Sequence, residues 1–443
     1  MRLTIATKHG QNKAEQVSAE RLVNMYSEAV DGKSNVVVHG AQGEDLFTTC
    51  GNGPIRGLHV HNKLLYAVSG TTLYEVDNGG VATSKGTIAG DGIVGMATNG
   101  TNLCIVNGAQ GYLYGSSLGQ ITDTDFGLAR TVGSLNGYFI FSDGTNSFFI
   151  NTTPFDGSNY DALDFASAEA NPDIINRIFV NHKELMLFGT ETMEPWVGDS
   201  GSFAFAAVVG AISEKGLASP WAIANIDNTV FWLDQNGIAR RMSDGYNPQI
   251  ISTTSEVEAW AGNAYSSAEA IAFIEDGHEF FALTFDNGTW VYDAATNLWH
   301  ERATWEKPRW RARCHSYIYE KNIVGDYETG ALYSLNGDTF TTNSTKMVSE
   351  MYAPPINMDG RKFKVAEIQL DLEQGEGGGE VRLWISNDGL TWRNAGFRSL
   401  GADGSREART IWRNLGQHRN LHRRYAFSGN FRRAVFSEFA RLT

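Results

Sequence analysis

Four short motifs hold the side chains whose types and spacing bear on chemistry. The first, Gly115-Ser-Ser-Leu-Gly119, has the Gly-x-Ser-x-Gly spacing of an esterase nucleophile. That motif needs a strand that runs directly into a helix, so that the serine sits on a sharp turn. Here it follows the strand-like Tyr112-Leu-Tyr114 and precedes another short strand. The sequence therefore favours a hairpin turn over a nucleophile.

The second motif, Ser386-Asn-Asp-Gly-Leu-Thr-Trp392, resembles the Asp-box of sialidases and other propellers, although the usual form has one more residue between the Asp and the Thr. In an Asp-box the aspartate caps a hairpin and the tryptophan packs beneath it, which is a structural role. Glycoside cleavage needs two carboxylates at a defined distance across a sugar site. The motif supplies no such pair, so we expect it to be structural.

An acidic cluster and a histidine pair are the candidate metal ligands. The cluster lacks the Asp-x-Asp-x-Asp-Gly spacing and closing Glu of a calcium loop, so it favours a solvated loop. His59 and His61 share one face of a strand, but two ligands without a third are weak support for a metal. We expect no catalytic residue, no metal and no cofactor, and hence no enzyme. The cluster comprises Asp156, Asp161, Asp164, Glu169 and Asp173.

The C-terminal segment is the candidate docking surface. After position 392 the chain has eleven arginines and three acidic residues, a net charge of +8, whereas the whole chain carries −14 and the part before it −22. Arginine interleaved with aromatic residues suits single-stranded nucleic acid or a protein interface. Because the rest of the chain is acidic, we favour the protein interface. The residues expected to dock are Arg419, Arg423, Arg424, Arg432 and Arg433.

The composition indicates the elements that hold these residues. Glycine is frequent (48), aromatic residues make up 12% and proline is scarce (9), which is typical of short strands joined by tight turns. No run approaches the length of a membrane span, and the first ten residues lack the apolar core of a signal peptide. Cys50, Cys104 and Cys314 are too few and too scattered for a disulfide framework, so we expect buried small hydrophobic residues. We expect a protein that is made and kept in the cytoplasm, or that leaves it without a classical signal, and that inserts in no membrane.

Residues 277–301 form the clearest piece of the predicted sheet. An aromatic-rich strand over 280–285 precedes Asp286-Asn287-Gly288, a hairpin sequence whose Asn and Gly tolerate positive φ angles. A second strand over 289–292, a turn and a third strand starting at 298 follow. The stretch therefore predicts a three-stranded meander.

Fainter copies of this meander recur along the chain. Their central residues are 40, 35, 47, 45, 50 and 41 positions apart, the roughly 40–50-residue pitch of a propeller blade. We expect an all-β fold with a β-propeller of six or seven blades, and we favour seven; a generic all-β protein with several meanders is the alternative. The central residues are Leu65, Ile105, Ile140, Leu187, Trp232, Ala282 and Ile323.

Other segments delimit the propeller. Residues 1–53 are expected to form an irregular arm that partly completes the propeller over 54–350, with one plausible strand at 36–39. The paired prolines at 354 and 355 fit a boundary. Residues 364–372 then alternate at period two, and we expect an antiparallel β-sandwich with its own core over 351–443. Helix is expected only within 252–262, where Thr253 begins a cap-like sequence.

Several stretches resemble a known family. They include Arg21-Leu-Val-Asn-Met25, Asp143-Gly-Thr-Asn-Ser-Phe-Phe-Ile150, Ala168-Glu-Ala-Asn-Pro-Asp-Ile-Ile175 and Glu184-Leu-Met-Leu-Phe-Gly-Thr-Glu-Thr-Met-Glu-Pro-Trp196. Together they resemble the tail accessory, or packaged-DNA-stabilisation, proteins that form the tail nozzle of P22-like short-tailed bacteriophages. The resemblance covers residues 20–305 well and the C-terminal part loosely.

The resemblance implies a non-enzymatic virion protein of the phage tail, assembled in the host cytoplasm. It implies a homohexameric ring below the portal and its adaptor protein, which extends the DNA channel, helps to retain packaged DNA and docks tail fibres, spikes or needle. Genomic DNA would pass without sequence-specific binding, and an acidic body that repels phosphates suits this. The alternative is a carbohydrate-binding or glycoside-cleaving β-propeller, motivated by the Asp-box-like hairpin and by Trp and Tyr side chains that can stack on sugars.

Overall fold

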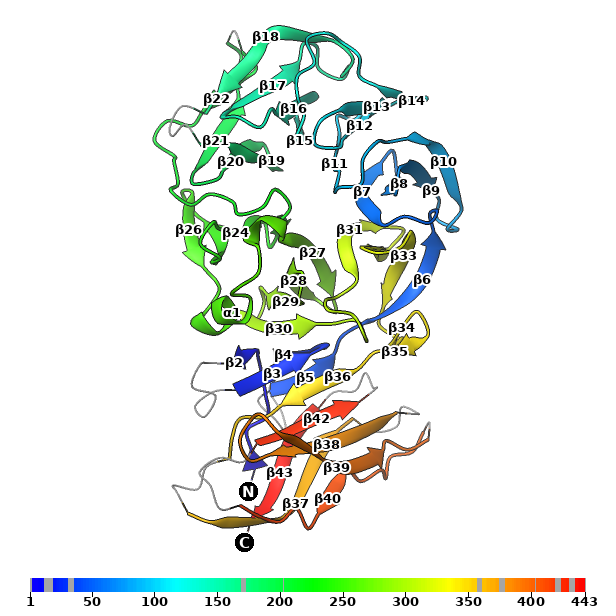
Figure 1. The fold of residues 1–443 in the computed structure, drawn as a ribbon, viewed down its shortest axis with the longest axis vertical. Coiled ribbons are helices and arrows are strands. Elements are labelled where there is room, and N and C mark those ends of the chain that lie inside the picture. Colours follow the sequence, from blue (N-terminus) through cyan, green and yellow to red (C-terminus); the bar gives the residue numbers. More distant parts are fainter. Residues whose placement is uncertain are drawn as a thin grey trace.

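The computed structural model is a ring of β-sheets attached to a second β-domain (Figure 1). It describes residues 2–11, 19–30, 36–168, 173–201, 203–356, 361–373, 379–402, 404–418, 424–429 and 435–442, with only the backbone at 436 and 437. Within these residues the ring has seven four-stranded antiparallel blades, so the predicted propeller and its favoured blade number are confirmed. The first strand of each blade faces the centre of the ring, where it lies beside the first strands of neighbouring blades.

The blades follow one another along the chain, and the last takes its outer strand from the N-terminal arm. They are β7 (Ile55–His61), β8 (Leu64–Ser69), β9 (Thr72–Val76) and β10 (Ala82–Thr87); β11 (Gly95–Thr98), β12 (Leu103–Val106), β13 (Gly111–Tyr114) and β14 (Leu118–Gln120); β15 (Thr131–Leu135), β16 (Tyr138–Ser142), β17 (Ser147–Asn151) and β18 (Tyr160–Ser167); β19 (Ile175–Asn181), β20 (Glu184–Gly189), β21 (Met193–Gly198) and β22 (Phe205–Ala207); β23 (Ile223–Ile226), β24 (Thr229–Leu233), β25 (Ala239–Ser243) and β26 (Asn247–Ile250); β27 (Glu269–Glu275), β28 (His278–Phe285), β29 (Gly288–Asp293) and β30 (Leu298–Arg302); and β31 (Ala312–Ile318), β32 (Lys321–Asp326), β33 (Ala331–Asn336) and β6 (Gly43–Thr49).

Tight turns join the first two strands of most blades. Asn62, Asn136, Asp227 and Asp276 begin such two-residue turns with φ between 49° and 54°, a region that Asn and Asp tolerate better than most residues. The predicted meander is confirmed as β28, β29 and β30. However, none of residues 286–288 has a positive φ; the positive φ angles of this blade lie one turn earlier, at Asp276 and Gly277.

Seven hydrophobic clusters fill the spaces between neighbouring blades. In one of them, Phe139 and Phe141 of the third blade pack against Cys104 and Val106 of the second. The second strand of each blade is buried on both faces because each face meets a different neighbour. This explains why these strands are continuous apolar runs in the sequence, and why Cys104 serves as a small buried hydrophobic residue.

The N-terminal arm is built of strands, so the prediction of an irregular arm was wrong. Its β6 completes the seventh blade by pairing antiparallel with β33, from Gly43 opposite Asn336 to Thr49 opposite Ala331. The partners that the arm finds outside itself lie hundreds of residues away, and local sequence does not reveal such pairings. The other strands are β1 (Arg2–Leu3), β2 (Gly10–Gln11), β3 (Ala19–Val23), β4 (Met25–Ala29) and β5 (Val36–Gly40), the last of which was predicted.

The C-terminal β-sandwich is confirmed, but its core is shared with the arm. Leu3, Leu22 and Val38 are buried among the apolar residues of both sandwich sheets. One sheet has the order β4-β5-β43-β37-β40, while the other continues from the sixth blade through β30, β3 and β36 to β42, β38 and β39. The strands are β36 (Ser349–Tyr352), β37 (Phe363–Leu372), β38 (Glu380–Ser386), β39 (Trp392–Ser399), β40 (Ile411–Arg413), β41 (Gln417–His418), β42 (Arg424–Gly429) and β43 (Val435–Leu442).

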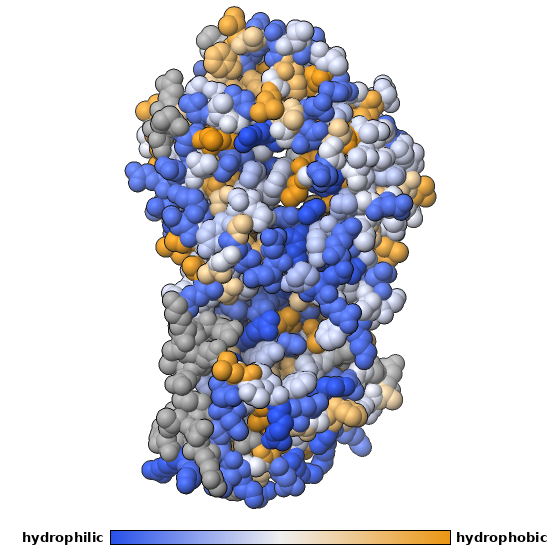
Figure 2. Space-filling model, viewed as in Figure 1, coloured by the Kyte–Doolittle hydropathy of each residue, from blue (hydrophilic) through white to orange (hydrophobic). Residues whose placement is uncertain are grey.

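The predicted helical segment is confirmed as α1 (Thr254–Ala259), which Thr253 and Glu256 cap reciprocally. The remaining elements are a 3-10 turn, η1 (Tyr265–Ser267), and the short hairpin of β34 (Thr341–Thr342) and β35 (Thr345–Lys346). No helix in the described part of the chain has the length and apolarity to cross a membrane. On the face shown in Figure 2 hydrophobic residues form small separate groups among hydrophilic ones. The domain boundaries after residues 53 and 350 stay a prediction.

Candidate functional site

The structure describes one of the five arginines expected to dock. Arg424 of β42 is buried; its Nη2 donates a hydrogen bond to the carbonyl of Ala19, at 2.8 Å. Its guanidinium also lies 5.5 Å from the ring centre of Trp392. Arg424 therefore ties the sandwich to the arm. Arg419, Arg423, Arg432 and Arg433 lie outside the described residues, and the docking role of this segment stays a prediction.

The Asp-box-like motif forms the β38–β39 hairpin, as expected. Asp388 Oδ1 accepts hydrogen bonds from the backbone amides of Leu390 and Thr391, at 2.9 and 2.7 Å, and from the Ser386 hydroxyl. These bonds hold the pKa of Asp388 well below its ordinary value. The ring of Trp392 packs edge-on against Tyr352, with centroids 5.2 Å apart. The motif therefore stabilises a turn.

Residues of the other three motifs also form turns or local hydrogen bonds. The Gly115–Gly119 motif spans the turn from β13 into β14. Asp156 accepts hydrogen bonds from Ser158 and Asn159 within its own loop. His61 Nδ1 lies 2.7 Å from the Thr98 hydroxyl. Within the described residues, no group of three or more His, Cys, Asp or Glu side chains is arranged to hold a metal ion.

A polar joint connects the arm, the sixth blade and the sandwich. The carboxylate of Glu301 accepts two hydrogen bonds from Arg21, at 2.6 and 2.7 Å, and lies 2.8 Å from Nδ1 of the buried His9. Burial alone would raise the pKa of Glu301, but the hydrogen bond from His9 and the charge of Arg21 outweigh it and lower this pKa to about 2. A bidentate arginine–carboxylate pair fixes both distance and orientation.

Asn24 is the second part of this joint. It lies between β3 and β4 with a φ of 53°, and its side-chain amide donates to the carbonyls of Ala303 and Val348 at 3.0 and 2.9 Å. Its side-chain oxygen accepts from the amide of Ala303. One buried asparagine thus links the arm to the end of the sixth blade and to the segment that leads into β36.

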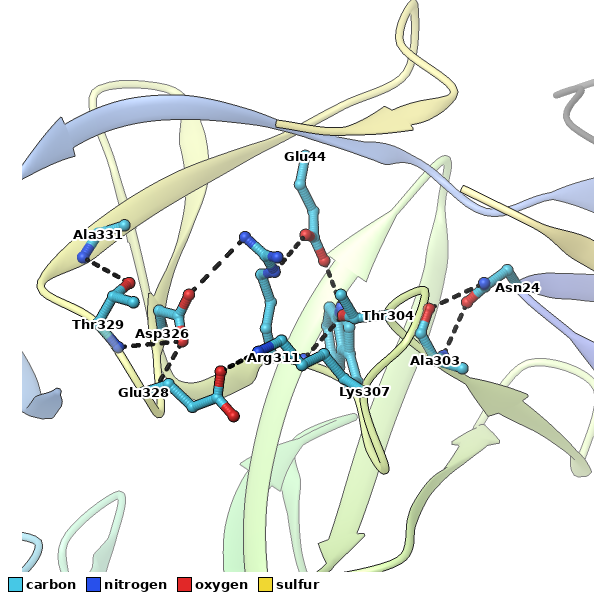
Figure 3. A network of polar contacts seen from close by, with 11 residues as sticks. Asn24, Glu44, Ala303, Thr304, Lys307, Arg311, Asp326, Glu328, Thr329 and Ala331 are labelled. Carbon is cyan, nitrogen blue, oxygen red and sulfur yellow. Dashed lines mark hydrogen bonds and ion pairs between the residues drawn. The ribbon is translucent and has the colours of Figure 1, made fainter. Parts of the chain in front are cut away.

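The third part of the joint holds β6 on the seventh blade (Figure 3). The Arg311 guanidinium lies 3.5 Å from the carboxylate of Glu44 and 3.7 Å from that of Asp326. Glu44 also accepts a hydrogen bond from the indole of Trp310. Burial raises the pKa of Glu44 although Arg311 opposes it. Removing Arg311 would leave the buried carboxylate of Glu44 without its cation, which is costly.

An aromatic groove of about 510 Å³ adjoins the joint. It runs along the outer face of β36, β42 and β38, and Trp305 of the propeller, half exposed, lies at its edge. Charged side chains also line it, among them Arg382 and Glu380, which form an ion pair at 2.7 Å. The groove thus offers flat aromatic faces beside polar groups. Its aromatic residues are Trp305, Tyr352, Trp384, Trp392 and Phe427.

Sequence reasoning missed both the joint and the groove. The stretch Arg21-Leu-Val-Asn-Met25 drew attention only as a resemblance, yet it contains Arg21 and Asn24 of the joint. Apart from the residue type, nothing in the local sequence predicts that an asparagine is buried at a positive φ. The groove combines residues from positions 305 to 429, so only the fold brings them together.

These features define a class of protein: a seven-bladed propeller fused to a sandwich through a rigid polar joint. A family model described as "Bacteriophage P22 Gp10, beta-propeller" matches residues 3–340, and one described as "Bacteriophage P22 Gp10, beta-sandwich" matches residues 349–441. The chain belongs to the bacteriophage P22 Gp10 family. It is therefore a phage structural protein, and the resemblance drawn from the sequence is confirmed.

Comparison with curated proteins gave no match. Among solved structures, the extracellular domain of BT4673 from B. thetaiotaomicron is similar with a TM-score of 0.47 and 9% identity, over 87% of this chain and 62% of that one. This chain thus spans less than two thirds of that structure. YCF48 from Cyanidioschyzon merolae is similar with a TM-score of 0.43 and 11% identity, over 65% of this chain and 97% of that one.

Proposed function

We propose that this protein is a subunit of a homohexameric nozzle ring in a phage tail, below the portal and its adaptor protein. In this role it extends the DNA channel, helps to retain the packaged genome and docks tail fibres, spikes or needle, without catalysing a reaction. The observation that carries the proposal is the match of both family models, propeller and sandwich in that order, along nearly the whole chain.

The uneven charge supports the same role. Residues 1–392 carry −22 and residues 393–443 carry +8. An acidic wall repels phosphates, so DNA slides past it without sequence-specific binding. A positive end and an acidic body also allow the sandwich of one copy to meet the propeller of the next. Such head-to-tail contacts close into rings.

The polar joint also supports the proposed role, because it makes the subunit rigid enough to form the wall of a tube. Between the two domains the sheet is continuous through β30, β3 and β36, and Glu301, Arg21 and Asn24 fix their orientation. A hinge between domains needs an interface with few cross-links, whereas this one has many. The subunit therefore suits the wall of a channel that withstands pressure from packaged DNA.

Electron microscopy of virions tests the proposal, because a nozzle subunit must be present in the tail with six-fold symmetry. Absence of the protein from particles would overturn it. Native mass spectrometry of the free protein adds the oligomeric state in solution. A monomer there is compatible with a ring that closes only on the assembled portal and adaptor.

A charge-reversal variant tests the docking segment. Replacing Arg419, Arg423 and Arg432 with Glu should prevent incorporation into particles while circular dichroism stays unchanged. The matched control replaces three exposed lysines of the propeller, Lys63, Lys183 and Lys321, and so makes the same change in net charge. Incorporation of both variants at the wild-type level would refute docking through this segment.

The aromatic groove favours one alternative, a carbohydrate-binding propeller protein. Trp305, Trp384 and Trp392 present indole rings of the kind that stack on sugars. A glycan array decides this alternative, with Trp305→Ala as the variant, because Trp305 is half exposed and its removal should leave the fold intact. Binding that this variant abolishes would support it; background binding by both forms would dismiss it.

A further inference from the structure

The third blade has an outer edge that no further strand covers within the described residues. Its outer strand β18 pairs with β17 alone, whereas β30 and β6 of the sixth and seventh blades have β3 and β34 beside them. β18 has eight residues, and the other uncovered outer strands have three to six. A long free edge is a place where another chain can attach. This edge lies at the end of the molecule farthest from the sandwich (Figure 1).

A bulge in β18 carries Leu163 outward. The register against β17 shifts between Tyr160 and Phe165, so that the four residues between them face a single residue of β17. The Asp161 carboxylate accepts a hydrogen bond from the amide of Leu163, at 2.9 Å, and so holds the bulge in place. As a result Leu163 is 80% exposed and Phe165 54% exposed. Bulges at sheet edges re-aim side chains, and here the side chain that points outward is apolar.

Exposed apolar side chains are concentrated in the third and fourth blades. Sixteen large hydrophobic residues are exposed in the described part of the chain, and seven of them lie between positions 128 and 212. Apolar surface that gathers in one part of a protein is typical of an interaction site, because its burial in a contact is favourable. The seven residues are Leu128, Phe155, Leu163, Phe165, Ile174, Val209 and Ile212.

The same edge is acidic and almost free of cations. Residues 121–173 contain eight acidic residues and one basic residue, Arg130, and their net charge of −7 is half of the charge of the whole chain. Those acidic residues of the segment that the structure describes form no ion pair with another described residue. Asp161 and Asp164 stand on either side of Leu163 in the sequence. A complementary surface is therefore positively charged and partly apolar.

The sandwich of a second copy has this complementary character. Residues 393–443 carry +8, and the exposed Phe439 and Arg441 stand two residues apart on β43, hence on one face of the sheet. Phe397 of β39 is exposed as well. The sandwich and β18 lie at opposite ends of the molecule (Figure 1), so a subunit meets this surface only on a neighbour. The exposed arginines of the sandwich are Arg393, Arg406, Arg409, Arg413 and Arg441.

We propose that the bulged edge of the third blade docks on the arginine-rich sandwich of a neighbouring copy. Leu163 and Phe165 are buried in this contact, and Asp161 and Asp164 face arginines. The inference rests on the ring proposed above and names the two surfaces that form its repeating contact. Because the two surfaces differ, each subunit uses both of them, and a closed ring leaves neither free. Opposite charges bring the surfaces together, and the apolar side chains at the centre hold them.

Cross-linking in assembled particles tests this contact. Leu163→Cys is labelled with a thiol-directed benzophenone, assembled into particles and irradiated, and the products are identified by mass spectrometry. Cys50 and Cys104 are buried and Cys314 is half-buried, so the new thiol is the most accessible one. We expect a dimer of this chain whose cross-linked peptide lies within residues 361–443. The matched control is Val81→Cys on the first blade, where Val81 is 61% exposed; it should give no such dimer.

A double substitution gives a second readout. Leu163→Glu combined with Phe165→Glu removes the apolar centre of the contact and adds negative charge, so the number of copies per particle should fall at least about tenfold. Thermal unfolding of the free protein should stay within a few degrees of the wild type, because more than half of each side chain is exposed. Val81→Glu combined with Ile250→Glu makes the same change at exposed positions of other blades and should assemble normally.

The failure of this contact and the failure of the proposed function give different results. A cross-link from position 163 to another virion protein, to a propeller or to no protein would overturn the contact, even in a tail that contains the protein with six-fold symmetry. Normal assembly of the Leu163→Glu and Phe165→Glu double variant would overturn it too. Absence of the protein from particles would overturn the proposed function, and the contact with it.

Discussion

Glu301 offers the sharpest test of the joint between propeller and sandwich. Its pKa is about 2 in the folded protein against an ordinary 4.5. Because the folded pKa is the lower one, the ionised carboxylate stabilises the fold above about pH 4.5, and this stabilisation is lost as the pH falls towards 2. The two values correspond to about 3 kcal/mol at pH 7, and to less than half of that at pH 3.

The variant Glu301→Gln removes the charge and keeps the size of the side chain. It leaves the Arg21 guanidinium and His9 without their carboxylate, so we expect it to lower the free energy of unfolding by about 3 kcal/mol at pH 7. Urea unfolding followed by tryptophan fluorescence, at pH 7, 5, 4 and 3, measures this loss. The difference from the wild type should shrink steadily below pH 4.5.

The matched control is Glu380→Gln, which also breaks an arginine–glutamate pair, but a solvent-exposed one with Arg382. Exposed pairs contribute about 0–1 kcal/mol, so this variant should lie close to the wild type at every pH. The reasoning would be refuted if Glu301→Gln matched the control at pH 7. A loss that stayed constant down to pH 3 would also refute it, because the electrostatic origin would then be wrong.

Three other predictions concern the strands that surround this joint. Glu438 of β43 is buried, neither carboxylate oxygen has a hydrogen-bond partner among the described residues, and burial raises its pKa to about 8. Stability should therefore fall as the pH rises from 4.5 to 8, and Glu438→Gln should unfold like the wild type at pH 3 but be more stable by about 2 kcal/mol at pH 6 and about 5 kcal/mol at pH 9; an unchanged pH profile would contradict this. A Cβ atom on Gly43 would lie 2.3 Å from the carbonyl oxygen of Thr339, so Gly43→Ala should cost about 1–3 kcal/mol and speed hydrogen exchange in β33, whereas Gly92→Ala, with open space around it, should not. In Asp388→Ala, faster amide exchange is expected only within the β38–β39 turn that Asp388 caps; exchange as in the wild type would show that the cap contributes nothing.

The propeller was predictable from the sequence because its repeat is local. Leu65, Ile140 and Trp232 lie in second strands that are buried on both faces, so apolar runs recur at the pitch of a blade. The turns between them use Asn and Asp for a physical reason, their tolerance of positive φ. The cap of α1 was equally visible, since Thr253 and Glu256 stand three residues apart.

The joint and the environment of Arg177 on β19 were not predictable in this way. Arg21 and Asn24 look like ordinary polar residues of a loop until Glu301 and Val348 are placed beside them. What distinguishes Arg177 is that its buried Nε and Nη1 have no hydrogen-bond partner among the described residues, and no sequence pattern records the absence of a distant partner. Both features depend on contacts between segments that are far apart in the chain.

The pairing of β6 with β33 also sets the order of events during synthesis. Gly43 meets Asn336, and at about 5–20 residues per second the ribosome needs roughly 15–60 s to make the residues between them. Through that interval β6 exists without its partner β33 while the earlier blades take shape, and β5 has only β4 beside it. An unpaired strand edge is a route to misassembly. The nascent arm is therefore open to misassembly for longer than the strands whose partners follow at once, and the ring closes only when its seventh blade has been made.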